Sequence, residues 1–136
     1  MPGESDLGKL LKRMEPTLGA GKYYFATVGG SQLLALSGYL NSIVDVFNEE
    51  EGLSIVFSED VKDGIAQLTS KPIVGPFAFI TLTVHSDLYA VGLLAKVSQA
   101  LASEGISLNA FSAYHHDHLF VPYERKDEAM DIISGI

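Results

Sequence analysis

The stretch of sequence that decides the fold runs from residue 77 to residue 84 and reads FAFITLTV. Alternate residues of an extended strand point to opposite faces of a sheet. On that rule, Ala78, Ile80, Leu82 and Val84 form an aliphatic face, and the aromatic and threonine side chains form the other. We therefore expect a strand with helices packed on its aliphatic face and a less apolar surface, such as another sheet, on its opposite face.

The chain that follows this strand predicts the order helix, strand, strand, helix. Leu94, Val97 and Leu101 are spaced as on one face of a helix, and Gly105 is a typical residue at a helix C-terminus. The expected elements are a helix over 91–103, a strand over 106–114, a hairpin tip at His116-Asp117, a strand over 118–123 and a last helix with an apolar stripe from Ala129 to Ile136.

The chain that precedes the strand predicts a similar but less regular order. Asp6 is placed to cap a short helix that Pro16 ends, and Ser58 precedes two acidic residues that favour a helix start. The expected elements are a helix over 7–14, a strand over 22–28, a strand over 53–57 and a helix from Ser58 to Leu68. Residues 31–46 stay open between a loop, a helical turn and a short strand at 43–47.

Two proline-containing pairs, Lys71-Pro72 and Gly75-Pro76, interrupt the pattern and mark the expected module boundary. We predict an N-terminal module over 1–70 and a C-terminal module over 77–136. The fold class is α+β, with two ferredoxin-like βαββαβ modules that have antiparallel sheets. Each half lacks an outer strand or shares one, which leaves an open sheet edge. Either the strand at 77–84 is both the last strand of the first module and the first strand of the second, or two chains pair their open edges.

The charge of the chain excludes several classes of function. Seventeen acidic and nine basic residues give a net charge of −8, and no stripe of Lys or Arg reverses it locally. A nucleic-acid partner is therefore not expected, because its phosphates would be repelled. The absence of cysteine removes disulfides, thiolate nucleophiles and Cys-ligated metals. With no signal-peptide pattern and no apolar run of membrane-spanning length, we expect a cytoplasmic protein without a membrane partner.

Several of these segments resemble the ACT domain family, and they occur in the family's order. They are ITLTV at 80–84, HSDLYAVGLL at 85–94, ALASEGISLNAFSAY at 100–114, HHDHLFVP at 115–122 and, upstream, FNEEEGLSIV at 47–56. The chain is most similar to bacterial tandem-ACT proteins of the ACT_3/ACT_7 type, which are similar to the ACT modules of aspartate kinases and of CASTOR-type arginine sensors. The resemblance implies regulation rather than turnover, with an amino acid bound where two modules meet.

The first candidate site is the turn from Ser86 to Leu93. A strand there leads into a helix through Gly92, so unpaired backbone N–H groups at a positive dipole end suit a ligand carboxylate. In the ACT resemblance this is the ligand loop, matched by Val91, Gly92 and Leu93. The alternative is structural: Asp87 caps the helix, and Gly92 packs closely against the sheet.

The second candidate segment is Ser112-Ala113-Tyr114 with Asp117. Carbonyls at a strand end and one carboxylate can accept the hydrogen bonds of an ammonium group. In the arginine-sensing relatives the equivalent aspartate holds the ligand; the alternative is that Asp117 stabilises a hairpin turn. The predicted ligand-binding residues are Ser86, Asp87, Val91, Gly92, Leu93, Ser112, Ala113, Tyr114 and Asp117, with no catalytic residue, metal or cofactor assigned.

Together these observations predict a non-catalytic sensor of a free amino acid that forms a homodimer and signals to another protein. No serine lies in a nucleophile-elbow context such as G-x-S-x-G. Two alternatives stay open. One is a ligand-free dimerisation module, and the other is a small metal-binding protein that uses the His115–His118 hairpin with His85.

Overall fold

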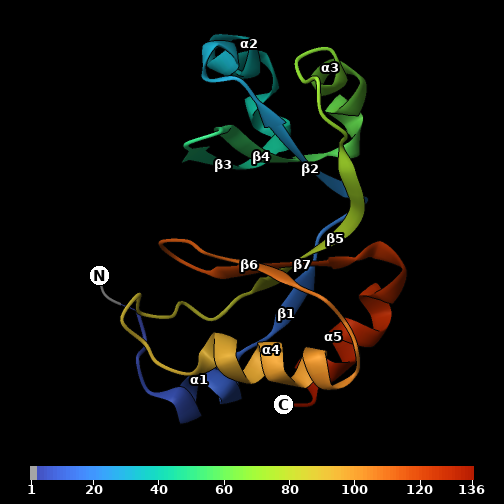
Figure 1. Cartoon of the computed structure of the whole chain (residues 1–136). Coiled ribbons are helices and arrows are strands. Elements are labelled where there is room, and N and C mark those ends of the chain that lie inside the picture. Colours follow the sequence, from blue (N-terminus) through green and yellow to red (C-terminus); the bar gives the residue numbers. More distant parts are fainter. Residues whose placement is uncertain (1–2) are drawn as a thin grey trace. The chain divides into compact units, whose positions relative to one another are not determined.

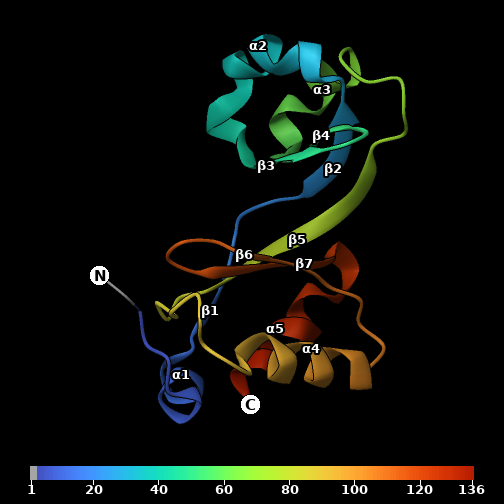
Figure 2. The same ribbon diagram turned by 60° about the vertical axis from the view of Figure 1, so that its left-hand side comes forward.

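The computed structural model describes residues 3–136, which form two compact units (Figures 1 and 2). One unit is Gly21–Phe77, and the other joins the residues up to Ala20 with Ala78–Ile136. Strand β5, Val74–Leu82, runs through the boundary between them. The chain therefore passes from one unit to the other inside a continuous strand, between Phe77 and Ala78.

The unit at 21–77 is a four-stranded sheet with helical segments on one face (Figure 1). Its strand order is β3-β4-β2-β5, and β2 pairs antiparallel with both β4 and the start of β5. Its core consists of alternate residues of β2 and β4, covered by Leu36 and Ile65. The elements are β2 (Tyr23–Val28), α2 (Leu33–Leu36) between 3-10 turns at Gly30–Gln32 and Ser37–Ser42, β3 (Ile43–Glu49), β4 (Gly52–Ser58), and α3 (Lys62–Ala66) after a 3-10 turn at Glu59–Val61.

The unit that holds the rest of the chain has the strand order β1-β5-β7-β6. Its helices α1, α4 and α5 lie on one face of this sheet (Figure 2). The elements are α1 (Leu7–Arg13), β1 (Pro16–Leu18), the end of β5, α4 (Leu93–Ser103), β6 (Asn109–Ser112), β7 (Asp117–Pro122) and α5 (Lys126–Ser134), with a 3-10 turn at Tyr123–Arg125.

Both units are βαββαβ modules, and β5 belongs to both of them. It is the last strand of the unit at 21–77. In the other unit it begins the order β5-α4-β6-β7-α5, and β1, which comes earlier in the chain, supplies the sixth element. The predicted fold class, two ferredoxin-like modules that share or lack an outer strand, is confirmed. The division into modules 1–70 and 77–136 stays a prediction; in space, the residues up to Ala20 lie with the C-terminal segment.

Strand β1 supplies the outer strand that the C-terminal half lacks in sequence. It pairs antiparallel with β5, with Pro16 opposite Leu82 and Leu18 opposite Ile80. Gly19 N–H donates to Phe79 O at 2.8 Å, which extends the ladder beyond β1. The sequence predicted only that Pro16 would end a helix, because three residues are too few to show a strand pattern.

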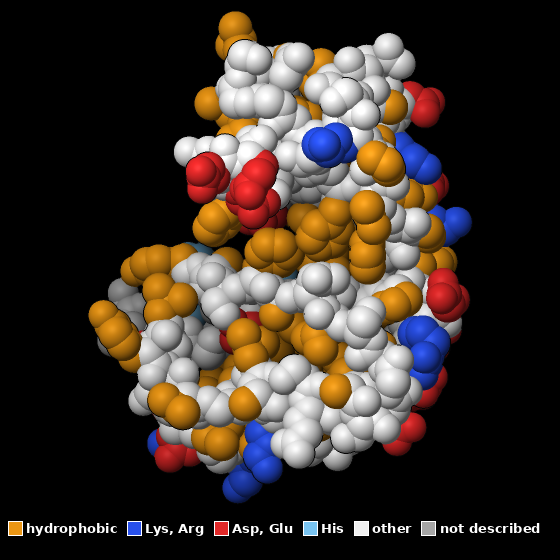
Figure 3. Space-filling view, in the orientation of Figure 1, with side chains coloured by type: hydrophobic (Ala, Val, Ile, Leu, Met, Phe, Trp, Pro, Cys, Tyr) orange, Lys and Arg blue, Asp and Glu red, His pale blue; other side chains and the backbone are white. Residues whose placement is uncertain are grey.

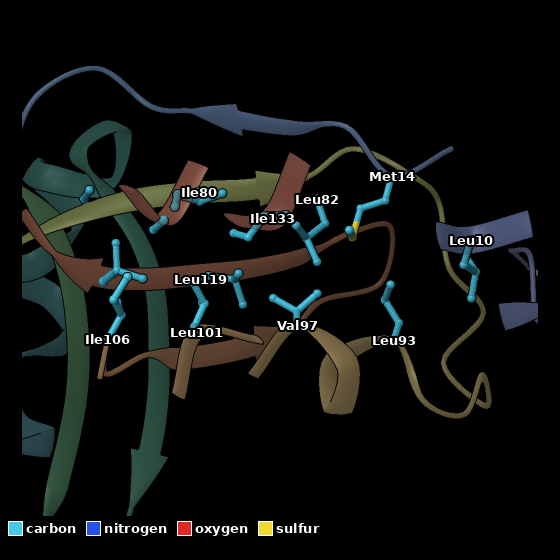
Figure 4. Close-up of a cluster of buried hydrophobic side chains, with 13 residues drawn as sticks. Leu10, Met14, Ile80, Leu82, Leu93, Val97, Leu101, Ile106, Leu119 and Ile133 are labelled. Atoms are coloured by element: carbon cyan, nitrogen blue, oxygen red, sulfur yellow. The ribbon is translucent and has the colours of Figure 1, made fainter. Parts of the chain in front are cut away.

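The alternation of β5 sets the core of the second unit (Figure 4). Ala78, Ile80 and Leu82 are fully buried against helix side chains such as Val97 and Ile133. This confirms the predicted helix-covered face. On the opposite face, Phe79 stacks on Phe120, with ring centroids 4.9 Å apart, and contacts His118 at 5.3 Å.

Replacing Leu82 with alanine should lower the free energy of unfolding by about 2–5 kcal/mol, because a buried leucine truncation leaves a cavity. Thr17 is exposed on the neighbouring strand β1, so Thr17→Ala is the control and should change stability by less than about 0.5 kcal/mol. Urea unfolding measures both variants. Equal effects of the two substitutions would contradict the assigned register.

Candidate functional site

A small cavity of about 120 Å³ lies where the loop after β5 meets α4 and the β6–β7 hairpin. Ser86, Asp87 and Leu88 line it from the loop, and Ser112 and Asp117 line it from the hairpin. The first turn of α4, together with Gly92, completes the wall. Since about 10–15 Å³ of such space holds one water, this cavity has room for a small organic group.

The N-terminus of α4 opens onto this cavity. Gly92 precedes the helix with φ 104° and has no side chain with which to cap it. The first N–H groups of a helix have no partner within the helix, and they carry a partial positive charge. Leu94 and Ala95 of this first turn line the cavity. The arrangement suits a bound anionic group.

The other polar wall of the cavity is a pair of buried side chains. Asp117 is 6% exposed and Ser86 is 9% exposed, and Ser86 Oγ donates a hydrogen bond to Asp117 Oδ2 at 3.1 Å. No salt bridge found among residues 3–136 includes Asp117. A buried carboxylate normally has a cationic partner or several donors, so a cationic ligand group is its natural complement.

The position of Asp117 differs from the predicted hairpin tip. The turn is closed by Ala113 N–H donating to His116 O at 3.0 Å, and Asp117 is the first residue of β7. Its side chain is therefore directed by the strand into the unit and not held in the exposed turn. Ala113 is exposed and lines neither of the cavities described here.

Asp87 shapes the loop instead of capping α4. Its Oδ1 accepts a hydrogen bond from Tyr89 N–H at 2.8 Å, and its carbonyl accepts one from Ala90 N–H at 2.9 Å. These bonds form a tight turn over 87–90. The predicted structural alternative was that Asp87 caps the helix. In the structure, Asp87 instead stabilises the turn that precedes the helix.

Most of the predicted site residues lie around the small cavity, and Tyr114 and Val91 do not. Ser86, Asp87, Gly92, Leu93, Ser112 and Asp117 come together around the small cavity. Tyr114 lines a neighbouring, more open cavity of about 340 Å³ that shares Ser86, Asp87 and Leu88 with the first. Val91 is 81% exposed and lines neither. The predicted set of ligand-binding residues left out Leu88 and Ala90, although both lie within the candidate turn from Ser86 to Leu93. It also left out Leu94 and Ala95, which directly follow that turn.

The histidines do not form a metal centre in the described part of the chain. Residues 3–136 contain no group of three or more His, Cys, Asp or Glu side chains that could hold a metal ion. His118 Nδ1 lies 2.9 Å from Thr81 Oγ1, and the rings of His85 and His115 are 5.2 Å apart. The metal-binding alternative therefore has no structural support.

Apolar side chains surround the cavity on the outside. Tyr89 is 92% exposed, and Leu88, Val91 and Tyr114 are also largely exposed. Figure 3 shows hydrophobic side chains gathered on this side of the unit. Exposed clusters of this kind usually mark surfaces that bind another molecule.

Within residues 3–136, no helix is long and apolar enough to span a membrane.

The fold and the cavity define a tandem pair of ferredoxin-like modules with room for a small molecule. The chain belongs to the ACT domain family: the ACT_3 model matches residues 2–66 and the ACT_7 model matches residues 75–134. Membership in this family supports a regulatory, ligand-binding role. No curated protein matches the chain.

Solved structures share this fold. A protein of unknown function from Vibrio cholerae, described as a possible transport protein, is 42% identical; the match covers 93% of this chain and 91% of that one, with a TM-score of 0.72. A protein from Agrobacterium tumefaciens is 18% identical over 90% and 88% of the two chains, with a TM-score of 0.71. The ligand-free regulatory subunit of aspartate kinase from Thermus thermophilus is 12% identical over 88% and 94%, with a TM-score of 0.68.

Ser86→Ala should lower the free energy of unfolding by about 1–3 kcal/mol, because it removes a hydrogen-bond donor from a buried carboxylate. Ser98→Ala is the matched control, since the Ser98 hydroxyl is exposed and bonds only to Ala95 O one turn back in α4. Thermal or urea unfolding compares the two. A Ser86→Ala protein as stable as the control would show that Asp117 does not depend on this hydrogen bond.

Proposed function

We propose that this protein is a non-catalytic sensor that binds a free amino acid in the cavity between the N-terminus of α4 and Asp117. The observation that carries the proposal is the presence of opposite charges on the two walls of one small cavity. The amides of Leu94 and Ala95 bring partial positive charge, and the Asp117 carboxylate brings negative charge. A free amino acid carries the complementary pair of charges on two groups bonded to the same carbon atom.

In the proposed complex, the ligand carboxylate accepts hydrogen bonds from the first turn of α4. The ligand ammonium donates to Asp117, and its other two protons have oxygen acceptors nearby on Ser86 and on the strand end at Ser112. Charge-assisted hydrogen bonds of this kind are the strong ones in proteins. The ligand side chain then points towards the open cavity lined by Tyr89 and Tyr114.

The lining of the two cavities favours some amino acids over others. Among the described residues, this lining includes two carboxylates, Asp87 and Asp117, and no Lys or Arg side chain. An acidic ligand side chain would add a charge of the same sign without a partner. Neutral and basic amino acids are therefore the proposed class, and aspartate and glutamate should bind weakest.

A homodimer is part of the same proposal. The sequence suggested it because outer strands were missing, but β1 and β5 supply those strands. Its support now comes from the exposed apolar side chains around the cavity, with Tyr89 at 92% exposure as the most prominent. A second copy that covers them would also shield the bound ligand from water. The ACT-domain membership of the chain is consistent with both roles.

A thermal-shift screen against the twenty amino acids tests the function. At least one neutral or basic amino acid should raise the melting temperature, since a ligand that binds only the folded state stabilises it. The ligand-free dimerisation module, which the exposed apolar surface favours, predicts no shift with any of them. A shift with aspartate alone would contradict the proposed ligand class.

Asp117→Asn should then weaken the binding of that amino acid by about 1.5–3 kcal/mol, the usual value for a hydrogen bond to a charged group. This is about ten- to a hundredfold in affinity by calorimetry. Asp131→Asn makes the same charge change at an exposed position of α5 and is the control. Gly92→Val would not test ligand binding alone, because it would also strain the backbone: Gly92 has φ 104°, and an added Cβ would lie 3.0 Å from Leu7 Cδ2.

Tyr89→Asp should shift the protein from dimer to monomer, because it places a charge in the surface that the second copy is proposed to cover. Light scattering over a concentration series measures the change, with Glu124→Gln at an exposed position as control. If wild-type protein is a monomer at every concentration, the dimer is ruled out while the ligand site is not.

A further inference from the structure

The segment Gly3–Glu4 is hydrogen-bonded to the loop that lines the candidate site. Glu4 pairs with Ser86 as a parallel β-bridge. Glu4 N–H donates to His85 O and Asp87 N–H donates to Glu4 O, each at 2.8 Å. These bonds fix the backbone on both sides of Ser86, the residue that donates to Asp117. The loop therefore depends on a segment about eighty residues away in the sequence.

The fit at Gly3 is too close for a side chain. A Cβ added there would lie 2.6 Å from His85 O and from the carbonyl carbon of Ser86, and 2.7 Å from Asp87 N. All three are backbone atoms, so they cannot rotate away as the end of a side chain would. Any larger residue has to lift the segment from the loop or push the loop into the cavity.

The segment is itself anchored to the unit through α1. The Glu4 carboxylate accepts hydrogen bonds from the backbone N–H groups of Ser5 and Asp6, and Leu10 of α1 is fully buried in the core. Leu7 lies against Gly92, at the far end of the same loop. The N-terminal residues thus contact both ends of the stretch from His85 to Gly92.

We propose that Gly3 and Glu4 are positioning residues of the candidate site, which hold Ser86 and Asp87 in the arrangement that a ligand requires. They act through the loop backbone and not by a side-chain contact with the ligand. The backbone pairing of Glu4 with the loop is argued from the hydrogen bonds alone. Its effect on the affinity for a ligand rests on the proposed function. The two parts are therefore tested by separate readouts.

The first readout is amide hydrogen exchange by NMR without any ligand. In the wild-type protein, the amides of Glu4 and Asp87 should have equal protection factors, because one opening event breaks both bonds. Gly3→Ala should speed the exchange of Asp87 by about tenfold or more, while amides of α5 keep their rates. Gly38→Ala is the matched control, because a Cβ at Gly38 meets nothing within 4 Å.

The second readout is calorimetry with L-leucine and L-arginine as neutral and basic probes. Gly3→Ala should weaken the binding of whichever probe the wild-type protein takes by about tenfold, which corresponds to about 1.4 kcal/mol. Gly38→Ala should leave that affinity unchanged. The melting temperature of Gly3→Ala should stay close to that of the control, which separates positioning from general destabilisation.

The outcomes distinguish this proposal from the proposed function. Unequal wild-type protection factors at Glu4 and Asp87, or unchanged Asp87 exchange in Gly3→Ala, overturn the pairing, and the wild-type comparison does not depend on how well the variant folds. Faster exchange with unchanged affinity overturns the positioning role. If no amino acid binds the wild-type protein, the proposed function fails and the positioning role fails with it, whereas the exchange rates still decide the pairing.

Discussion

The structure depends on the hydrogen bonding and alternation of one strand, β5. Its residues before Ala78 pair with β2, and its residues from Ile80 to Leu82 pair with β1. Its aliphatic face is the centre of one core, because Ala78, Ile80 and Leu82 all have zero exposure. Where β5 ends, the chain enters the loop that lines the cavity. The strand that completes both modules therefore also places the candidate site.

Local patterns predicted much of this fold. The alternation at 77–84 gave the correct buried face, and the apolar spacing at Leu94, Val97 and Leu101 gave α4, which begins at Leu93. Strand β1 was missed because its three residues include Pro16 and form a strand only through pairing with β5. The stretch at 31–46 stayed open because it forms short helical turns before β3, each too brief to show a period.

The candidate site was predicted only in part, because sequence spacing does not show which distant residues the fold brings together. Residue types showed that Gly92 and Asp117 suit a ligand, but spacing alone placed Asp117 in an exposed turn. The three-dimensional fold instead buries it beside Ser86, 31 residues away in sequence. Two further features involve backbone atoms, which a pattern of side chains does not reveal. One is the turn that Asp87 stabilises, and the other is the pairing of Glu4 with the loop.

The central claim is that a free amino acid binds between the N-terminus of α4 and Asp117. An NMR titration of the backbone amides with the best ligand from the screen tests it most directly. Binding at this site should give the largest shift changes at residues 86–95 and 112–117, with saturation at one ligand per site. Changes confined to residues 21–77, or scattered changes without saturation, would contradict it.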